Sequence, residues 1–230
     1  MGDMMEKVKK NPFDRETIAD EMLQEWQNIL DETANIFNVP AGLITRLDGD
    51  LIEIFLSSKG EHNPYPVAVS AKYPGSGWYC EETLKSRALN LIPNAFKDEQ
   101  WKENDAAVDL NMISYLGMPI SRPDGGFFGT VCFIDNKKNA HNDMHIRLIT
   151  QIKRMIELSL HVILDRQEID MRDGILDDLS RIYPICSYCK KIREKSGRWI
   201  SVEKYLKNLS GATATHGVCP ECYEREMQKL

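Results

Sequence analysis

Apolar residues first recur at helical spacing between residues 14 and 38. Asp14 suits the N-cap of a helix, and Asn38 comes just before Val39-Pro40. The residue before a proline disfavours the helical conformation, so the helix should end there. The apolar positions that share one side are Ile18, Met22, Trp26, Ile29 and Phe37. This pattern predicts a first helix over residues 14–38.

Two pairs of β-rich runs follow, and a tight-turn signal joins each pair. The first pair covers residues 41–47 and 51–57 around Asp48-Gly49-Asp50. The second pair covers residues 115–121 and 127–135 around Pro123-Asp124-Gly125-Gly126. Such turns join antiparallel strands, whereas parallel strands need long crossovers. The pattern therefore predicts two antiparallel hairpins.

The segment between the two hairpins is less regular. The stretch 57–77 is rich in Gly, Pro and Ser and indicates loop, in which 66–70 is the one segment with the pattern of a short strand. A short helix at 78–86 and a buried strand at 88–92 follow. Residues 93–113 are polar and aperiodic, which indicates loop with short helical turns. With about five strands and helices before and after them, we predict an α+β domain built on an antiparallel sheet.

Residues 143–181 then show a long helical pattern with a seven-residue apolar period. The positions in the period are Leu148, Met155, Val162, Ile169 and Leu176, with Ile152, Leu158 and Leu179 beside them. A seven-residue period favours packing along a partner helix, so we expect a homodimer formed through helices. The alternative is one helix that covers the sheet, followed by a shorter helix after a break at Gly174.

The composition and net charge of the chain argue against nucleic-acid binding and against a membrane protein. The 230 residues carry a net charge of −6 and are 42% hydrophobic, as in ordinary globular proteins. The negative charge argues against bulk attraction to nucleic acid or anionic lipid. No apolar run approaches the roughly 20 residues that span a bilayer, and the N-terminus lacks a signal-peptide pattern. We expect a cytoplasmic protein, in which six cysteines serve as free thiols or metal ligands.

Four cysteines near the C-terminus form two CxxC pairs. They are Cys186, Cys189, Cys219 and Cys222. Two such turns can complete the tetrahedron that zinc prefers, so we predict a Zn²⁺ site that stabilises a small module. His216 is a fifth candidate, either as a ligand in place of one cysteine or as a hydrogen-bond donor to a thiolate. Redox-active or merely buried CxxC pairs are the alternative.

The same segment carries a basic cluster. Its members are Lys190, Lys191, Arg193, Lys195 and Arg198. Such a cluster is more often a solvated face than a nucleic-acid site, so we expect a protein partner rather than nucleic acid.

Several ordered strings resemble a subgroup of bacterial GAF domains. These are Gly77-Trp78-Tyr79-Cys80-Glu81-Glu82, Ile92-Pro93-Asn94-Ala95-Phe96-Lys97-Asp98, Ser114-Tyr115-Leu116-Gly117-Met118-Pro119-Ile120 and Phe128-Gly129-Thr130-Val131-Cys132. The resemblance covers about residues 15–165. It implies a central antiparallel sheet flanked by helices, a small-molecule pocket beside the sheet, and helices that mediate dimerisation. The cysteine-rich segment is similar to a tail found on bacterial sensor and response-regulator proteins.

By this family comparison, the pocket lies under the variable segments between strands. The candidate ligand-binding residues are Trp78, Tyr79, Asn94, Asp98, Trp101, Asn111 and Tyr115. Aromatic walls with a few polar groups suit a small organic ligand. The alternative is that the aromatic residues fill the core and that Asn94 and Asp98 cap turns.

The sequence does not match the residue signatures of three known activities of GAF domains. Bilin attachment uses a cysteine that is usually followed by histidine, whereas Glu81 follows Cys80 and Phe133 follows Cys132. The cyclic-nucleotide signature and the cysteine set of free-methionine sulfoxide reductases are not matched. No partnered nucleophile or phosphate loop is present, so we identify no catalytic residue.

We therefore predict a non-catalytic cytoplasmic sensor or adaptor. Residues 1–14 form an N-terminal tail, 15–165 a GAF-like domain, 166–182 a helical linker and 183–230 a zinc-binding module. The domain binds an unidentified small molecule, and the tail contacts a protein partner. The alternatives are a ligand-free dimerisation protein and a thiol-based enzyme that uses Cys80.

Overall fold

The computed structural model describes residues 11–179, 183–194, 196–211 and 213–229, without the side chains of 174–179 and 209–210. Most of the predicted N-terminal tail, the last three residues of the predicted linker and Lys195 of the basic cluster lie outside this description. Contacts between residues divide the chain into two compact units. The first ends at Arg166 and the second begins at Gln167.

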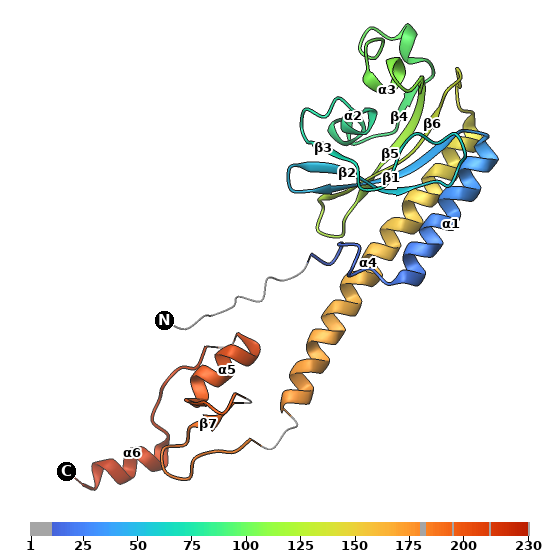
Figure 1. Cartoon of the computed structure of the whole chain (residues 1–230). Helices are drawn as coiled ribbons and strands as arrows, with labels where there is room; N and C mark the ends of the chain where they lie inside the picture. The colour runs from blue at the N-terminus through green and yellow to red at the C-terminus, as the bar shows by residue number, and fades with distance from the viewer. Residues whose placement is uncertain (1–10, 180–182, 195, 212, 230) are drawn as a thin grey trace. The chain divides into compact units, whose positions relative to one another are not determined.

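An antiparallel six-stranded sheet forms the centre of the first unit (Figure 1). Its strands are β1 (Ala41–Asp48), β2 (Leu51–Ser57), β3 (Ser70–Lys72), β4 (Asn90–Ile92), β5 (Ser114–Ser121) and β6 (Phe127–Asp135). They lie in the order β3-β2-β1-β6-β5-β4. The predicted α+β class, the antiparallel sheet and both hairpins are confirmed. There are six strands rather than about five, and the strand expected at 66–70 lies at 70–72.

Helices precede, interrupt and follow the sheet. They are α1 (Asp20–Phe37), α2 (Tyr79–Ser86), the 3₁₀ turn η1 (Ala95–Lys97), α3 (Asp105–Val108) and α4 (Asp143–Leu179). The predicted start of the first helix was wrong, because Asp14 does not cap it. The Asp14 carboxylate instead accepts from Arg46 on β1, with Nη1 2.7 Å from Oδ1. The helix ends as expected, at a left-handed Asn38.

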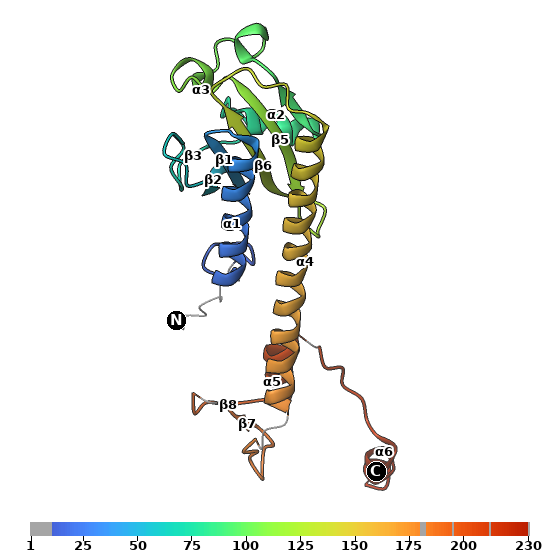
Figure 2. The ribbon, with the colours of Figure 1, turned by 90° about the vertical axis from the view of Figure 1, so that its right-hand side faces the viewer.

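The sheet is covered on both faces. Helices α1 and α4 lie side by side on one face (Figure 2), where Trp26, Leu30 and Phe133 belong to one buried core. On the other face, α2 contributes Leu84 to a second core around Tyr115. The alternating side chains of β6 join the two cores, since neighbouring residues of a strand point to opposite faces.

The central strands approach each other closely where β1 meets β6. The register of the β1–β2 pair shifts at Ile44/Thr45. The buried hydroxyls of Thr45 and Thr130 lie 2.8 Å apart, and the Thr130 amide donates to the Thr45 hydroxyl. A Cβ at Gly129 would overlap the carbonyl oxygen of Thr45, so only glycine fits there.

Helix α4 is continuous over residues 143–179, so the backbone does not break at Gly174. Its buried residues are Ile149, Ile152, Ile156, Leu160 and Ile163. Of the predicted seven-residue stripe, Leu148 and Met155 pack partly against the core. Val162 and Ile169 are 55% and 54% exposed, and Leu158 is 67% exposed. The side chains of Leu176 and Leu179 lie outside the description.

The exposed apolar residues of α4 do not make it a membrane segment. Among the described helices, none is both long and apolar enough to cross a bilayer.

The second unit contains a small hairpin and two short helices. They are β7 (Ile192–Arg193), β8 (Trp199–Ile200), α5 (Val202–Ser210) and α6 (Pro220–Met227). Ile192 and Ile200 are its buried hydrophobic residues among those described, while Val202 and Leu206 are each 37% exposed. A segment with so small a core needs further stabilisation.

Candidate functional site

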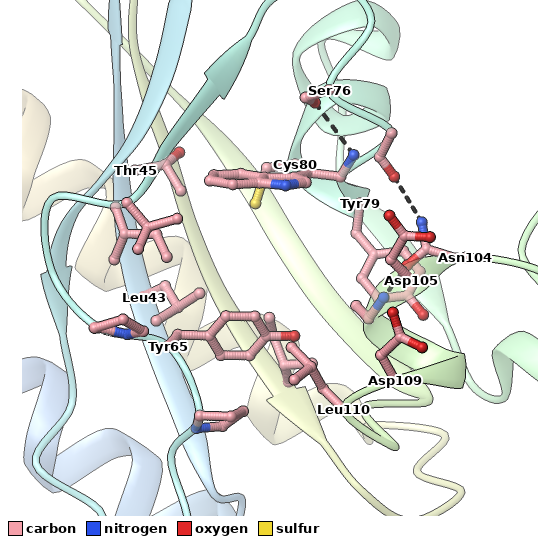
Figure 3. A pocket seen from close by; sticks show the side chains of 18 residues that line it. Leu43, Thr45, Tyr65, Ser76, Tyr79, Cys80, Asn104, Asp105, Asp109 and Leu110 are labelled. Atoms are coloured by element: carbon pink, nitrogen blue, oxygen red, sulfur yellow. Dashed lines mark hydrogen bonds between the residues drawn. The ribbon is translucent and has the colours of Figure 1, made fainter.

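A cavity of about 310 Å³ lies on the sheet face opposite α1 and α4. Its volume is at the lower end of the roughly 300–1,000 Å³ that small-molecule pockets occupy. Strands β1, β2 and β6 form one wall through Leu43, Ile54 and Ile134. The loop before β3, the start of α2 and helix α3 form the remaining walls (Figure 3).

Three aromatic side chains line the cavity. They are Tyr65, Trp78 and Tyr79. The Tyr79 ring packs edge-on against Trp101, with ring centroids 4.9 Å apart, and its hydroxyl donates to the Met112 carbonyl over 3.0 Å. Burial raises the pKa of Tyr79 to about 12. Tyr79 is therefore held in one orientation as a neutral wall.

Tyr65 differs from Tyr79 because its hydroxyl has no hydrogen-bond partner in the described part of the chain. The ring reaches across the cavity toward Asp109 and Leu110 (Figure 3). Its oxygen is buried and makes no hydrogen bond with any described residue. Burial, followed by the nearby Cys132 and Cys80, raises the pKa of Tyr65 far above its usual range. A buried hydroxyl without a partner is costly, so this wall can gain from a ligand that supplies one.

Helix α3 contributes the polar rim of the cavity. Asn104 caps this helix by accepting from the Ala106 amide, and its Nδ2 donates to the Gly77 carbonyl over 2.6 Å. Asp105 and Asp109 lie one turn apart on the same wall (Figure 3). Both are exposed, and no Lys, Arg or His is among the lining residues. The cavity therefore combines apolar and aromatic walls with an acidic rim.

Glu81 positions the wall formed by residues 75–78. Its carboxylate is buried and accepts from the amides of Gly75, Ser76 and Gly77 at 2.6 to 3.2 Å. It also pairs with Lys85 at 2.6 Å. Burial opposes its ionisation, but the bonds from Lys85, Ser76 and the amides outweigh burial and lower the pKa of Glu81 to about 2.

Replacing Glu81 with Gln should destabilise the first unit by about 1–2 kcal/mol at pH 7, because charge-assisted hydrogen bonds are lost. The folded pKa of about 2 lies below the ordinary value of about 4.3. Ionised Glu81 thus stabilises the fold above that ordinary value, and this contribution is lost as the pH falls toward 2. Urea unfolding of both proteins from pH 7 to pH 3 measures the difference.

Glu82→Gln is the matched control for this prediction, since Glu82 is the next residue of α2 and its side chain makes no hydrogen bond or ion pair with a described residue. We expect it to change stability by less than about 0.5 kcal/mol. A Glu81→Gln difference that stayed constant down to pH 3 would contradict the role given to the ionised carboxylate.

The structure places two of the seven predicted ligand-binding residues, Trp78 and Tyr79, on the cavity wall. The other five, Asn94, Asp98, Trp101, Asn111 and Tyr115, are not among the residues that line it.

Those five residues have structural contacts or positions instead. Asn94 and Asp98 accept hydrogen bonds from the amides of Phe96 and Gln100, which is the turn-capping alternative. Trp101 and Tyr115 are buried, and the Tyr115 hydroxyl lies 2.8 Å from that of Thr83. Asn111 has a left-handed backbone. Whether any of the seven binds a ligand stays a prediction.

Several residues that shape the cavity were not predicted from the sequence. They are Tyr65, Glu81, Asn104, Asp105 and Asp109. A signal existed for Glu81, because a glutamate at the third position of a helix reaches back to amides before it. A second signal was Asn104 followed by Asp105, a typical helix start. Nothing local marked Tyr65.

Cys80, which lines the cavity, contacts Cys132 of β6. Both are buried, their sulfur atoms lie 3.7 Å apart, and Cys80 lines the cavity. The hydrogen bond with Cys132 lowers the pKa of Cys80, whereas burial raises the pKa of Cys132. Both cysteines belong to the core on the cavity side of the sheet.

The four C-terminal cysteines form two local pairs in the second unit. A turn closed by a 2.9 Å bond from the Lys190 amide to the Cys186 carbonyl carries Cys186 and Cys189, whose side chains contact each other. Cys219 is the N-cap of α6, and Cys222 lies in the first turn of that helix. Each pair alone offers two thiols on one side of a turn.

The two pairs do not form one cluster in this structure. Among the described residues, no three His, Cys, Asp or Glu side chains come together as a metal-binding group. His216 instead lies 3.7 Å from Glu203. Four thiolates remain a donor set that suits zinc in chemistry and number, so the zinc site stays a prediction.

A comparison with known protein families and structures identifies the family of this chain. The family model described as GAF domain matches residues 21–160. No curated protein matches the chain.

Three solved structures share the fold. The blue-light absorbing form of the Thermosynechococcus elongatus PixJ GAF domain aligns at 13% identity over 71% of this chain and 99% of its own, with a TM-score of 0.52. A methyl-accepting chemotaxis protein segment aligns at 15% identity over 61% and 88%, with a TM-score of 0.50. A far-red cyanobacteriochrome photoreceptor aligns at 12% identity over 61% and 86%, with a TM-score of 0.50. At these identities the likeness shows the fold alone.

Proposed function

The chain belongs to the GAF domain family, and on that premise we propose that it is a non-catalytic signal-transduction sensor. Its GAF domain binds a small molecule, and α4 passes the occupancy of the cavity to the C-terminal segment. The observation that carries the proposal is the cavity of about 310 Å³ with aromatic walls and an acidic rim. The solved relatives include photoreceptor and chemotaxis proteins, which suits a sensory role.

The sheet offers a physical route from the cavity to α4. Ile134 lines the cavity, and Cys132 belongs to the same core as Ile134. Their strand neighbours Val131 and Phe133 belong to the opposite core, together with Ile149 and Ile156 of α4. A shift of β6 caused by a ligand would therefore alter the packing of α4, because close-packed cores transmit displacement.

A substitution that fills the cavity tests this route without knowledge of the ligand. Ala106 lines the cavity, whereas Val108 on the same short helix is exposed and does not. We expect Ala106→Trp to change amide hydrogen exchange in residues 143–179 by several-fold, and Val108→Trp to leave it unchanged. Equal exchange in both variants and the wild type would contradict the relay.

We also propose that the protein is a homodimer formed through its helices and that the C-terminal segment contacts a protein partner. The dimer is supported by Leu158, Val162 and Ile169, which expose apolar side chains along α4. Apolar stripes of this kind are typical of helices that pack on a second copy. Sedimentation of the wild type and of a Val162→Glu/Ile169→Glu variant tests the dimer, and a monomeric wild type would contradict it.

We further propose that Cys186, Cys189, Cys219 and Cys222 bind one zinc ion and that this ion stabilises the C-terminal module. The support is the donor set and the small core of the second unit. Metal binding would have to bring the two cysteine pairs together, because the described residues include no metal-binding group of three or more side chains.

A second candidate function, thiol redox chemistry, is favoured by the 3.7 Å between the sulfur atoms of Cys80 and Cys132. A peroxide reaching the cavity would oxidise Cys80 to a sulfenic acid and release water or an alcohol. The Cys132 thiol would then displace water to form a disulfide. Mass spectrometry after peroxide treatment should show the loss of two hydrogens. An intact dithiol that persists in excess peroxide would remove this candidate.

A further inference from the structure

The charged residues of the cavity are of one sign. Asp105 and Asp109 are its charged lining residues. Neither carboxylate makes an ion pair or side-chain hydrogen bond with a described residue. Both charges are thus free to interact with a ligand, and they repel an anion that approaches the same rim.

The aromatic walls favour the same sign of ligand charge. Tyr65, Trp78 and Tyr79 surround the cavity, and the electron-rich face of an aromatic ring attracts a cation. Burial keeps both tyrosines neutral, because it raises their pKa values. The rings also accommodate a flat apolar body, against the aliphatic wall of Leu43, Ile54 and Ile134.

The buried Tyr65 hydroxyl is an independent sign of a polar ligand group. It has no partner among the described residues, and its ring points toward the side of the cavity that carries Asp109 (Figure 3). The hydroxyl oxygen has almost no accessible surface, so an ammonium group held by the carboxylates donates to it only after the Tyr65 side chain turns toward the rim. A purely apolar ligand would leave the hydroxyl unpaired.

We propose that the cavity selects a small aromatic amine, with its ring between the aromatic and aliphatic walls and its ammonium group facing Asp105, Asp109 and Tyr65. This inference rests on the proposed function, since it names the ligand class of the same cavity. It excludes phosphate-bearing and carboxylate-bearing ligands as the preferred class.

Three indole compounds of similar size test the proposal. Tryptamine is cationic, tryptophol is neutral and indole-3-acetate is anionic at pH 7. We expect isothermal titration of the full chain to give about tenfold tighter binding of tryptamine than of tryptophol, with indole-3-acetate weakest.

Variants of the rim separate the charge effect from the cavity itself. In Asp105→Asn/Asp109→Asn, the preference for tryptamine over tryptophol should fall to about threefold or less, with tryptophol affinity unchanged. Tyr65→Phe should weaken tryptamine by about threefold. Glu99→Gln/Glu103→Gln removes the same charge from outside the cavity and should keep the full preference.

The outcomes distinguish this inference from the proposed function. Equal binding of the three compounds, tightest binding of indole-3-acetate, or a preference that survives Asp105→Asn/Asp109→Asn would overturn the amine proposal and leave a ligand-binding cavity. If none of the three bound at millimolar concentration, the amine proposal would also be overturned. The proposed function would then be judged separately, by the exchange measurements on Ala106→Trp.

Discussion

Removing zinc with a chelator is expected to unfold the C-terminal module and to leave the GAF domain folded. The module has two buried hydrophobic side chains among its described residues, Ile192 and Ile200, and cannot rely on its core. A structural zinc ion contributes about 10–16 kcal/mol in small zinc-binding peptides, so its loss is decisive for a segment of this size. Cleavage by a protease within residues 186–222 should accelerate on the order of a hundredfold.

Two variants accompany the chelation experiment. Cys186→Ser should lose the metal and behave like the chelated wild type, whereas Cys80→Ala removes a buried thiol of the GAF domain and should keep one zinc per chain. If freshly purified protein held no stoichiometric metal, or if chelation left protease resistance unchanged, the zinc proposal would be wrong.

Replacing Phe128 with Ala is expected to destabilise the GAF domain by about 4 kcal/mol. The side chain is 1% exposed and meets three other rings edge-on. Its centroid lies 6.2 Å from that of Phe13, 5.9 Å from Trp26 and 5.5 Å from Phe55. It therefore joins the segment before α1, helix α1, β2 and β6. A typical domain has only about 5–15 kcal/mol of stability, so this loss is a large part of it.

Urea unfolding followed by tryptophan fluorescence measures this loss, since Trp26 belongs to the same cluster. Phe96→Ala is the control, because Phe96 is exposed on η1 and should cost less than about 0.5 kcal/mol. A Phe128→Ala effect below about 1 kcal/mol would show that this cluster does not organise the core.

The parts of the fold that could be predicted are those set by local patterns. Both hairpins follow from turn residues between β-rich runs, and α1 ends where Asn38 precedes Val39-Pro40. The start of α1 could not be predicted in this way. Asp14 pairs with Arg46, 32 residues along the chain, and this long-range contact removes its side chain from capping.

The cavity was predictable only near α2. Trp78 and Tyr79 were predicted from the resemblance to GAF domains, which implies a pocket under the segments between the strands. Tyr65 lies in a loop whose position depends on tertiary hydrogen bonds. Asn63 Nδ2 donates to Ser57 Oγ over 2.8 Å, and Ser57 Oγ donates to the Tyr65 carbonyl over 2.7 Å. The pattern of apolar and polar residues does not reveal such hydrogen bonds, so Tyr65 was not predicted as a lining residue.

Tyr115 shows the opposite error. It was a candidate because the resemblance to GAF domains includes it and because aromatic walls suit a small organic ligand. In the structure it shares a core with Leu43 and Ile134, which line the cavity. Its hydroxyl contacts Thr83 and Cys80 in the core, so α2 separates it from the cavity lining. A side chain on the cavity side of a sheet can thus still lie in the core, with a helix between it and the cavity.

We propose above all that the cavity of the GAF domain holds a small molecule. Native mass spectrometry of the full chain tests this directly, before and after incubation with cationic, neutral and anionic aromatic compounds. We predict that the wild type carries one added small mass per chain in at least one condition, that Ala106→Trp carries none, and that Val108→Trp behaves like the wild type. A wild type that remains without any bound compound in every condition would contradict the account.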